Sequence, residues 1–124
     1  KHDIALPISS LATFVKEADQ LVQNSFPDLP IINFGHIGDG NLHYNVLVPL
    51  DYSASSYKET TADLNKKIHD LVTQFNGSIS AEHGVGTLRR EELKRYKSSV
   101  EMELMIAIKR AIDPNQIMNP GKLL

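Results

Sequence analysis

Three imidazoles, a carboxylate and an amide lie beside glycines in two short segments of this chain, Gly35–Asn45 and Glu82–Gly86. An apolar run at 31–34 precedes the first segment and alternating apolar and polar residues follow it, so a β-hairpin is predicted around the glycine-rich turn. His36 and His43 then flank the turn. Directly opposed residues of an antiparallel pair carry Cβ atoms roughly 5 Å apart on one face. The spacing therefore predicts two imidazoles close enough to share one metal ion.

The residue types around this turn are those of an open metal site. Two histidines and one carboxylate are the protein ligands of known catalytic zinc centres, in which the remaining position is left for water or substrate. Glu82 is the candidate carboxylate, and Asn45 shares the predicted face of His43 because it follows two residues later. Zinc is the expected ion, but imidazole and carboxylate together also suit Mn²⁺ and Fe²⁺. The alternative is a structural role, because H-x6-H is not a zinc-finger spacing and histidines near turns often serve the fold.

The elements that must hold these residues are expected in the order β-α-β-β-α-β. Strands are expected at 4–6, 31–34, 42–48 and 78–81, and amphipathic helices at 11–22 and 57–75. This order is that of a ferredoxin-like split antiparallel sheet, an α+β fold with both helices on one face and the other face free for a partner. The last strand delivers Glu82 and His83, which point in opposite directions unless the glycines that follow turn the backbone.

Two additional C-terminal helices are expected at 88–96 and 99–112. The second is predicted to turn an apolar stripe inward, made of Val100, Leu104, Ile108, Ala111 and Ile112. The mixed charges at 89–95 are typical of an exposed, ion-paired helix face. His69 lies next to polar neighbours within an earlier helix and is expected at the surface.

Composition sets the bounds on the class of protein. A chain of 124 residues with 41% hydrophobic content suits one domain with one core. Cysteine is absent, which excludes disulfides and thiolate chemistry and fits a reducing compartment; the cytoplasm is expected, with an organelle matrix as the alternative. A net charge of −2 gives no electrostatic case for nucleic acid or an anionic membrane surface. No apolar run reaches the roughly 20 residues that span a bilayer.

Three motifs in this order resemble one known family. GHIGDGNLHYNV begins at Gly35, AEHGVGTLRR at Ala81 and DPNQIMNPGK at Asp113. Together they look like the C-terminal domain of FAD-linked oxidases of the vanillyl-alcohol oxidase superfamily. The closest-looking branch contains D-lactate dehydrogenase, the glycolate oxidase flavin subunit and D-2-hydroxyglutarate dehydrogenase. The resemblance runs from Lys1 to Lys122 and so covers essentially the whole chain.

The resemblance implies a role for each residue of the two segments. In the metal-dependent members, the two histidines of the GHxGDGNxH motif and the glutamate of EHG bind the ion. These residues correspond here to His36, His43 and Glu82. The next residue, His83, matches the family's catalytic base, and Asn45 matches a residue near the substrate.

The resemblance also implies a longer enzyme. The chain holds no glycine-rich phosphate-binding fingerprint, and 124 residues leave no room for the family's FAD-binding domain. Residues 1–124 are therefore expected to be the substrate- and metal-binding fragment of a flavin-dependent dehydrogenase. That enzyme oxidises a D-2-hydroxy acid to a 2-oxo acid and transfers hydride to FAD. Lys1 matches a lysine near the substrate carboxylate, and Asn119 matches a contact with the cofactor-binding domain.

Two alternatives stay open at this point. One is a metal-independent flavin oxidase in which His36 and His43 only shape the substrate pocket. The other is a non-catalytic metal-binding or interaction module, because a ferredoxin-like fold hosts many unrelated functions. If the parent protein is a flavoenzyme, with or without a metal, the isolated chain is expected to be colourless and inactive. It is also expected to self-associate through the sheet face that the FAD domain covers in the parent enzyme.

Overall fold

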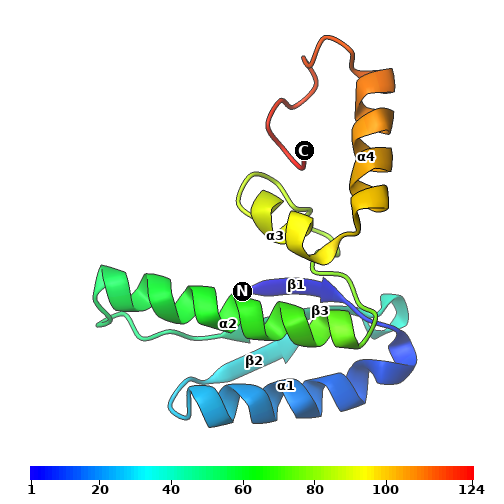
Figure 1. The fold of residues 1–124 in the computed structure, drawn as a ribbon. Coiled ribbons are helices and arrows are strands. Elements are labelled where there is room, and N and C mark those ends of the chain that lie inside the picture. The colour runs from blue at the N-terminus through cyan, green and yellow to red at the C-terminus, as the bar shows by residue number, and fades with distance from the viewer. The chain divides into compact units, whose positions relative to one another are not determined.

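The chain divides into two compact units in a computed structural model that describes residues 1–124. The first unit is Lys1–Glu82 and the second is His83–Leu124. The first unit contains all three strands (Figure 1), which are β1 (His2–Ala5), β2 (Ile31–Phe34) and β3 (Asn41–Val46). β3 is central and antiparallel to both neighbours, so the strand order is β1-β3-β2.

Two helices, α1 (Leu11–Ser25) and α2 (Ala54–Gln74), cover one face of this sheet. Phe14 of α1 joins the layers: its ring meets Tyr44 of β3 at a centroid distance of 6.4 Å and Phe75, which caps α2, at 5.6 Å. Both pairs are edge-on, a favoured geometry for aromatic rings. The amphipathic helix expected at 11–22 is confirmed, and α1 buries Phe14, Ala18 and Val22.

His69 is buried, which corrects the expectation that it lies at the surface. Only 1% of the residue is exposed, and its ring stands edge-on to that of His2 at 5.3 Å. The physical reason is the width of the buried face of α2. Ile68 and Val72 define that face. His69 follows Ile68 directly and lies three residues before Val72, so it falls within the same broad buried stripe.

The expected fourth strand at 78–81 is reduced to one bridge. Ser78 pairs with Ala5 of β1 in both directions, at 2.7 and 3.0 Å. The ladder then stops because a side chain replaces the backbone as the acceptor: Asp3 accepts the amide of Glu82 at 2.8 Å. The α+β class with C-terminal helices is confirmed, with three named strands in place of four.

The second unit contains α3 (Arg90–Tyr96) and α4 (Ser99–Ile112). Ser98 and Glu101 form a reciprocal capping box that fixes the start of α4. The predicted inward stripe of α4 is wrong, because four of its residues are more than half exposed: Val100, Leu104, Ile108 and Ile112. Amphipathic spacing identifies which face of a helix is apolar, but not whether another element covers that face. The neighbouring helix in the sequence, α3, has only 7 residues and is too short to cover the apolar face of α4.

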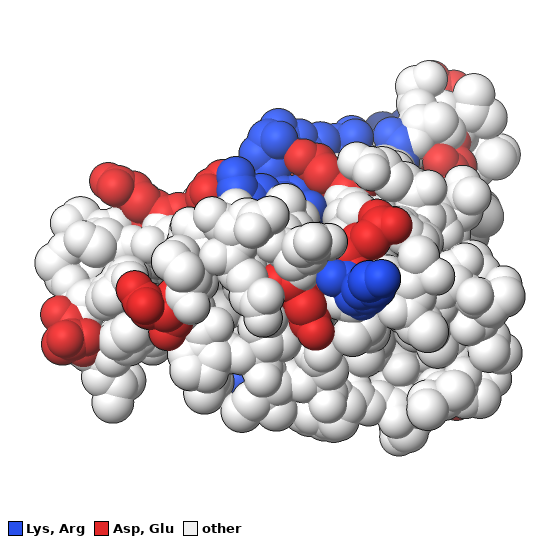
Figure 2. Space-filling model, turned by 90° about the horizontal axis from the view of Figure 1, so that it is seen from below, with Lys and Arg blue, Asp and Glu red and all other residues white.

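Charged side chains of both signs are interspersed on the face shown in Figure 2.

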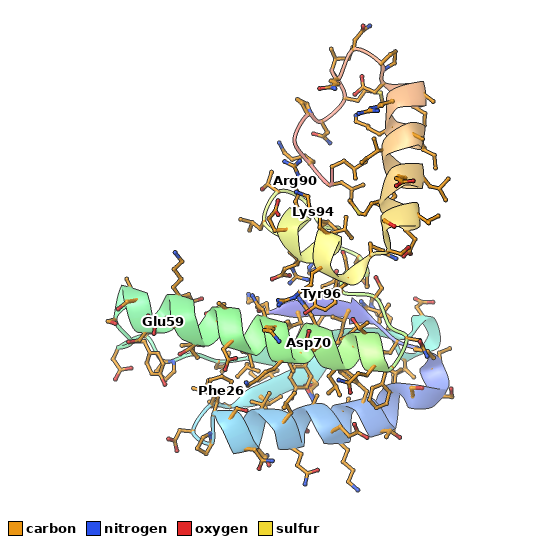
Figure 3. The ribbon with its side chains drawn as sticks, in the orientation of Figure 1. Phe26, Glu59, Asp70, Arg90, Lys94 and Tyr96 are labelled. Atoms are coloured by element: carbon orange, nitrogen blue, oxygen red, sulfur yellow. The ribbon has the colours of Figure 1, made fainter.

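On α3 (Figure 3), Lys94 donates to Glu91 at 2.7 Å and Arg90 donates to the Gly121 carbonyl at 3.5 Å. The predicted ion-paired face is thus confirmed for Glu91 and Lys94. Glu92 on the same helix is partly buried, and this burial raises the pKa of its carboxyl. None of the helices has both the length and the apolar character needed to cross a bilayer.

Candidate functional site

The turn between β2 and β3 carries the first histidine of the predicted site. It contains a short 3₁₀ turn, η2 (Ile37–Asp39), and β2 ends with Phe34 directly opposite His43 of β3. The expectation that His36 opposes His43 is therefore wrong, since His36 lies two residues beyond the ladder. Its carbonyl instead accepts the amides of Asp39 at 3.0 Å and Asn41 at 3.2 Å, which holds the turn closed.

Glycine is required at two positions of this turn. Gly40 has a φ of 69°, a left-handed conformation that L-residues adopt at a cost, and a Cβ there would lie 2.1 Å from the Leu6 carbonyl oxygen. A Cβ on Gly35 would lie 2.3 Å from the Asn41 carbonyl oxygen. Gly38 is different, because a Cβ on it would meet nothing within 4 Å beyond its chain neighbours.

Replacing Gly40 with alanine is expected to lower the free energy of unfolding by at least about 2 kcal/mol, from left-handed strain and a clash with fixed backbone. Gly38→Ala is the matched control and is expected to change stability little, because its Cβ enters open space. Denaturant unfolding of both variants measures the difference. Equal stability of the two variants would contradict the proposed geometry of the turn.

The Glu82 carboxylate brings both histidines to one place. Its Oε1 lies 2.7 Å from Nδ1 of His36, and its Oε2 lies 3.7 Å from Nε2 of His43. Each imidazole therefore lies beside one oxygen of the same carboxylate. His36 and His43 thus share one carboxylate as a neighbour, and this arrangement results from the turn and Glu82 rather than from direct cross-strand pairing.

The chemistry of these three donors suits a divalent ion. Their imidazole nitrogens lie 2.7 and 3.7 Å from the two different oxygens of Glu82. Two imidazole nitrogens and one carboxylate leave further positions open for water or a substrate oxygen.

Burial increases across the cluster from His36 to His43. The side chain of His36 is 63% exposed, that of Glu82 42%, and that of His43 13%. Phe34 covers His43, with ring centroids 5.0 Å apart and planes tilted by 39°. One side of the cluster is thus open to an entering molecule, while the other side is fixed by packing.

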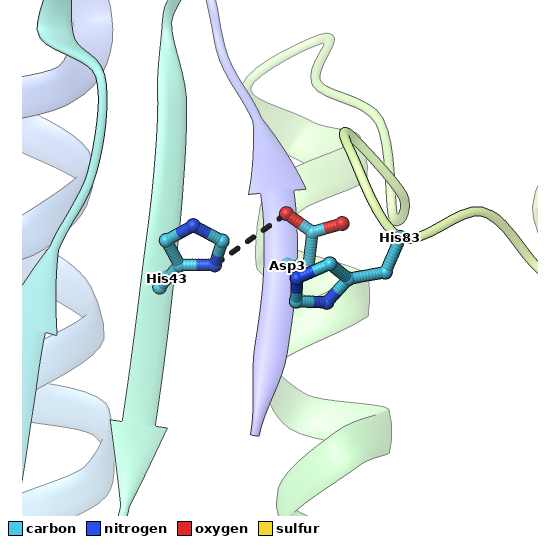
Figure 4. A group of neighbouring side chains, drawn as sticks. All are labelled: Asp3, His43 and His83. Carbon is cyan, nitrogen blue, oxygen red and sulfur yellow. Dashed lines mark ion pairs between the residues drawn. The ribbon is translucent and has the colours of Figure 1, made fainter.

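Asp3 is the functional candidate that the sequence analysis missed. Its carboxylate lies 3.6 Å from Nδ1 of His43, as the dashed line in Figure 4 marks, and only 3% of the residue is exposed. Oδ1 accepts from the Asn41 amide at 3.0 Å. The available signal was a charged residue one position from the expected strand at 4–6, where apolar residues are usual.

The other predicted site residues are spread over both units. Asn45 lies on β3 two residues after His43 and is opposite Ile32, so it shares the face of His43. Lys1 immediately precedes β1 and is exposed. His83, labelled in Figure 4, begins the second unit, and Asn119 lies in that unit's C-terminal loop with a φ of 48°.

The backbone at 81–83 forms a bend and not a strand. The strict alternation of side chains in a strand therefore does not apply to Glu82 and His83. Because they are consecutive residues, their Cα atoms are about 3.8 Å apart. The backbone of His83 therefore directly follows that of the residue whose carboxylate contacts both histidines.

An open apolar hollow of about 750 Å³ also lies in the first unit. It is lined from α1 and from the β2–β3 turn by Ile8, Leu11, Ala12, Val15, Asn33, Phe34, Gly35, Ile37, Asn41 and Leu42. None of these side chains exchanges protons near neutral pH. The hollow therefore offers no acid–base or metal-binding side chain.

Comparison with known proteins gives a match over nearly the whole chain. The family described as FAD linked oxidases, C-terminal domain, matches residues 1–123. A D-2-hydroxyglutarate dehydrogenase of Stutzerimonas stutzeri is 46% identical over 123 residues, which cover 99% of this chain and 26% of that protein. A D-lactate dehydrogenase of Anaerostipes hadrus is 34% identical over 121 residues, covering 98% of this chain and 25% of that protein.

A plant relative also matches along the whole chain. The probable mitochondrial D-2-hydroxyglutarate dehydrogenase of Oryza sativa subsp. japonica is 36% identical over 124 residues, which cover 100% of this chain and 21% of that protein. The chain thus spans about a quarter or less of the length of these curated relatives.

Proposed function

The chain belongs to the family of FAD-linked oxidase C-terminal domains, and on that premise we propose that it forms the substrate- and metal-binding domain of a flavin-dependent dehydrogenase. The proposed reaction oxidises a D-2-hydroxy acid to a 2-oxo acid. The relatives named as D-2-hydroxyglutarate and D-lactate dehydrogenases support this substrate class. The FAD-binding domain of the same enzyme is the proposed partner of residues 1–124.

The observation that carries the proposal is the position of Glu82 between two imidazoles. We assign His36, His43 and Glu82 as the ligands of a divalent ion, with zinc as the expected one. Their donor types fit such an ion, and the exposed side of His36 leaves room for substrate to approach. When bound, the ion supplies a Lewis acid that lowers the pKa of a substrate hydroxyl, and FAD supplies the hydride acceptor.

His83 is the proposed general base. Its imidazole would accept the proton of the substrate hydroxyl, and the FAD of the complete enzyme would accept the hydride from the carbon that bears this hydroxyl, so that a carbonyl would form. Histidine suits this step because it exchanges protons near neutral pH. His83 directly follows the proposed ligand Glu82 in the sequence.

Three further residues have proposed roles in binding. Asn45, on the same sheet face as His43, and Lys1, which precedes β1, are the proposed substrate contacts. An amide and an ammonium group suit the hydroxyl and carboxylate of a 2-hydroxy acid. Asn119 is the proposed contact with the FAD side of the enzyme.

The test is a screen of D-2-hydroxy acids against the complete flavoenzyme, with loss of the oxidised flavin's absorbance as the signal. D-isomers are expected to bleach the flavin and L-isomers are not. Chelation is expected to abolish the reaction and added Zn²⁺ to restore it. Undiminished turnover after verified metal removal would instead indicate a metal-independent oxidase, and no bleaching by any hydroxy acid would contradict the proposed dehydrogenase.

The isolated chain 1–124 is expected to purify colourless, without flavin, and to self-associate. The sheet face opposite the helices carries Ile32 and Phe34, which are 49% and 59% exposed, and exposed apolar surface favours association. Absorbance near the flavin bands and light scattering measure the two properties. Stoichiometric flavin on the isolated chain, or a strict monomer at high concentration, would contradict the respective part of this prediction.

A further inference from the structure

Asp3 is a charged residue in a place where charge is costly. It lies on β1 with 3% of its surface exposed. Removing a carboxylate from water is unfavourable unless hydrogen bonds and opposite or polar groups compensate. The groups that surround the Asp3 carboxylate therefore indicate why an acid is present at this position.

The two oxygens of Asp3 contact two different parts of the first unit. Oδ1 faces β3, where it accepts from the Asn41 side-chain amide at 3.0 Å and lies 3.6 Å from Nδ1 of His43. Oδ2 accepts the backbone amides of Glu82 at 2.8 Å and Ala81 at 3.3 Å. One buried carboxylate thus contacts the side chain of one proposed ion ligand and the backbone of another.

We propose that Asp3 is a positioning residue that prepares His43 and Glu82 to bind the ion. The inference rests on the proposed function of these residues as ligands. Nδ1 of His43 is directed toward Asp3, and Nε2 is directed toward the Glu82 carboxylate. A carboxylate beside Nδ1 favours the tautomer with its proton there, which leaves the Nε2 lone pair free for a metal. Carboxylates that orient metal-binding histidines in this way are a recurrent part of metal sites.

The second contact of Asp3 controls where the Glu82 side chain starts. The ladder between β1 and the chain after 77 consists of the single bridge at Ser78, so the backbone at 81–82 has no strand to hold it. The Asp3 carboxylate supplies the missing acceptor there. Its position fixes the direction of His43 and the origin of Glu82 at once.

Asp3→Asn is the informative variant because it keeps the shape of the side chain. Its amide oxygen can still accept backbone amides, but its NH₂ group can face Nδ1 of His43. That contact favours the opposite tautomer, with the proton on Nε2, which must be removed before a metal can bind. Asp63→Asn is the matched control, because Asp63 is a half-exposed carboxylate of α2 paired with Lys67 at 3.1 Å.

Two measurements on the complete flavoenzyme test the proposal. Nitrogen NMR of ¹⁵N-histidine-labelled, metal-free protein reports the tautomer of His43, whose signals are identified by their loss in His43→Gln. Wild type and Asp63→Asn are expected to carry the proton on Nδ1, and Asp3→Asn on Nε2. Competition with a chelator is expected to give a Zn²⁺ affinity that is lower in Asp3→Asn by roughly 10–100-fold.

The outcomes separate this inference from the proposed function. A wild-type His43 with its proton on Nε2 would overturn the positioning role without any variant. An Asp3→Asn protein could also lose Zn²⁺ affinity in parallel with its thermal midpoint while the tautomer of His43 stays unchanged. That result would overturn the positioning role as well, since it would show that Asp3 only stabilises the fold. Wild-type protein that binds no Zn²⁺ would contradict the proposed metal site, whereas the tautomer measurement would still decide whether Asp3 sets the state of His43.

Discussion

His36→Ala in the complete enzyme is expected to lose nearly all bound metal and most turnover together. Removing one of three protein ligands leaves two, too few for a stable open site. His36 is the cleaner target of the two histidines, because its side chain is 63% exposed and its removal leaves no cavity in the core. Metal analysis by mass spectrometry and steady-state turnover are measured on the same preparation.

His43→Ala is expected to give the same loss with an added cost in stability. The His43 side chain is only 13% exposed and packs against Phe34, so its truncation removes buried contacts. Comparison of the two variants separates metal binding from folding. A His36→Ala enzyme that keeps its full metal content and turnover would contradict the ligand assignment.

His83→Asn is expected to leave metal bound and to slow flavin reduction by roughly 10²–10⁴-fold, the usual contribution of a positioned general base. Asparagine is polar and similar in size but cannot accept the hydroxyl proton as imidazole does. Rapid mixing with substrate measures flavin reduction directly, apart from later steps. In His36→Ala, metal content and turnover are expected to fall together, whereas in His83→Asn only the rate of flavin reduction is expected to fall.

Two results would reject this role for His83. Flavin reduction at the wild-type rate would show that another group takes the proton. Loss of metal from His83→Asn would instead place the imidazole among the ligands. Far-UV circular dichroism serves as the control that the variant has folded.

The sequence patterns predicted the local elements well, because those depend on neighbouring residues. The apolar periodicity at 11–22 predicted the amphipathic helix α1, which buries Phe14, Ala18 and Val22, and the expected bounds of α4 agree with the structure. Glycines and alternating residues located the turn that holds His36. The sequence did not predict that the apolar face of α4 is exposed, because the pattern of a helix contains no information about which element packs against it.

The part of the site that escaped prediction depends on distant contacts. Asp3 meets Asn41, 38 residues away, and Glu82, 79 residues away. No spacing rule connects positions so far apart. His69 was misplaced for a related reason, since its burial against His2 depends on how α2 packs on β1. The cluster around Glu82 was accessible to prediction because its three residues lie in glycine-rich segments of recognisable type.

The bond between Asp3 and the Glu82 amide also has a consequence for the order of folding. Contacts that close long loops carry a high entropic cost and form slowly compared with local ones. These two partners are 79 positions apart, and the segment between them includes β2, β3 and both long helices. His36, His43 and Glu82 therefore come together only when the first unit is essentially complete. An ion bound by these proposed ligands would be captured late in folding, after the sheet and its two helices have formed.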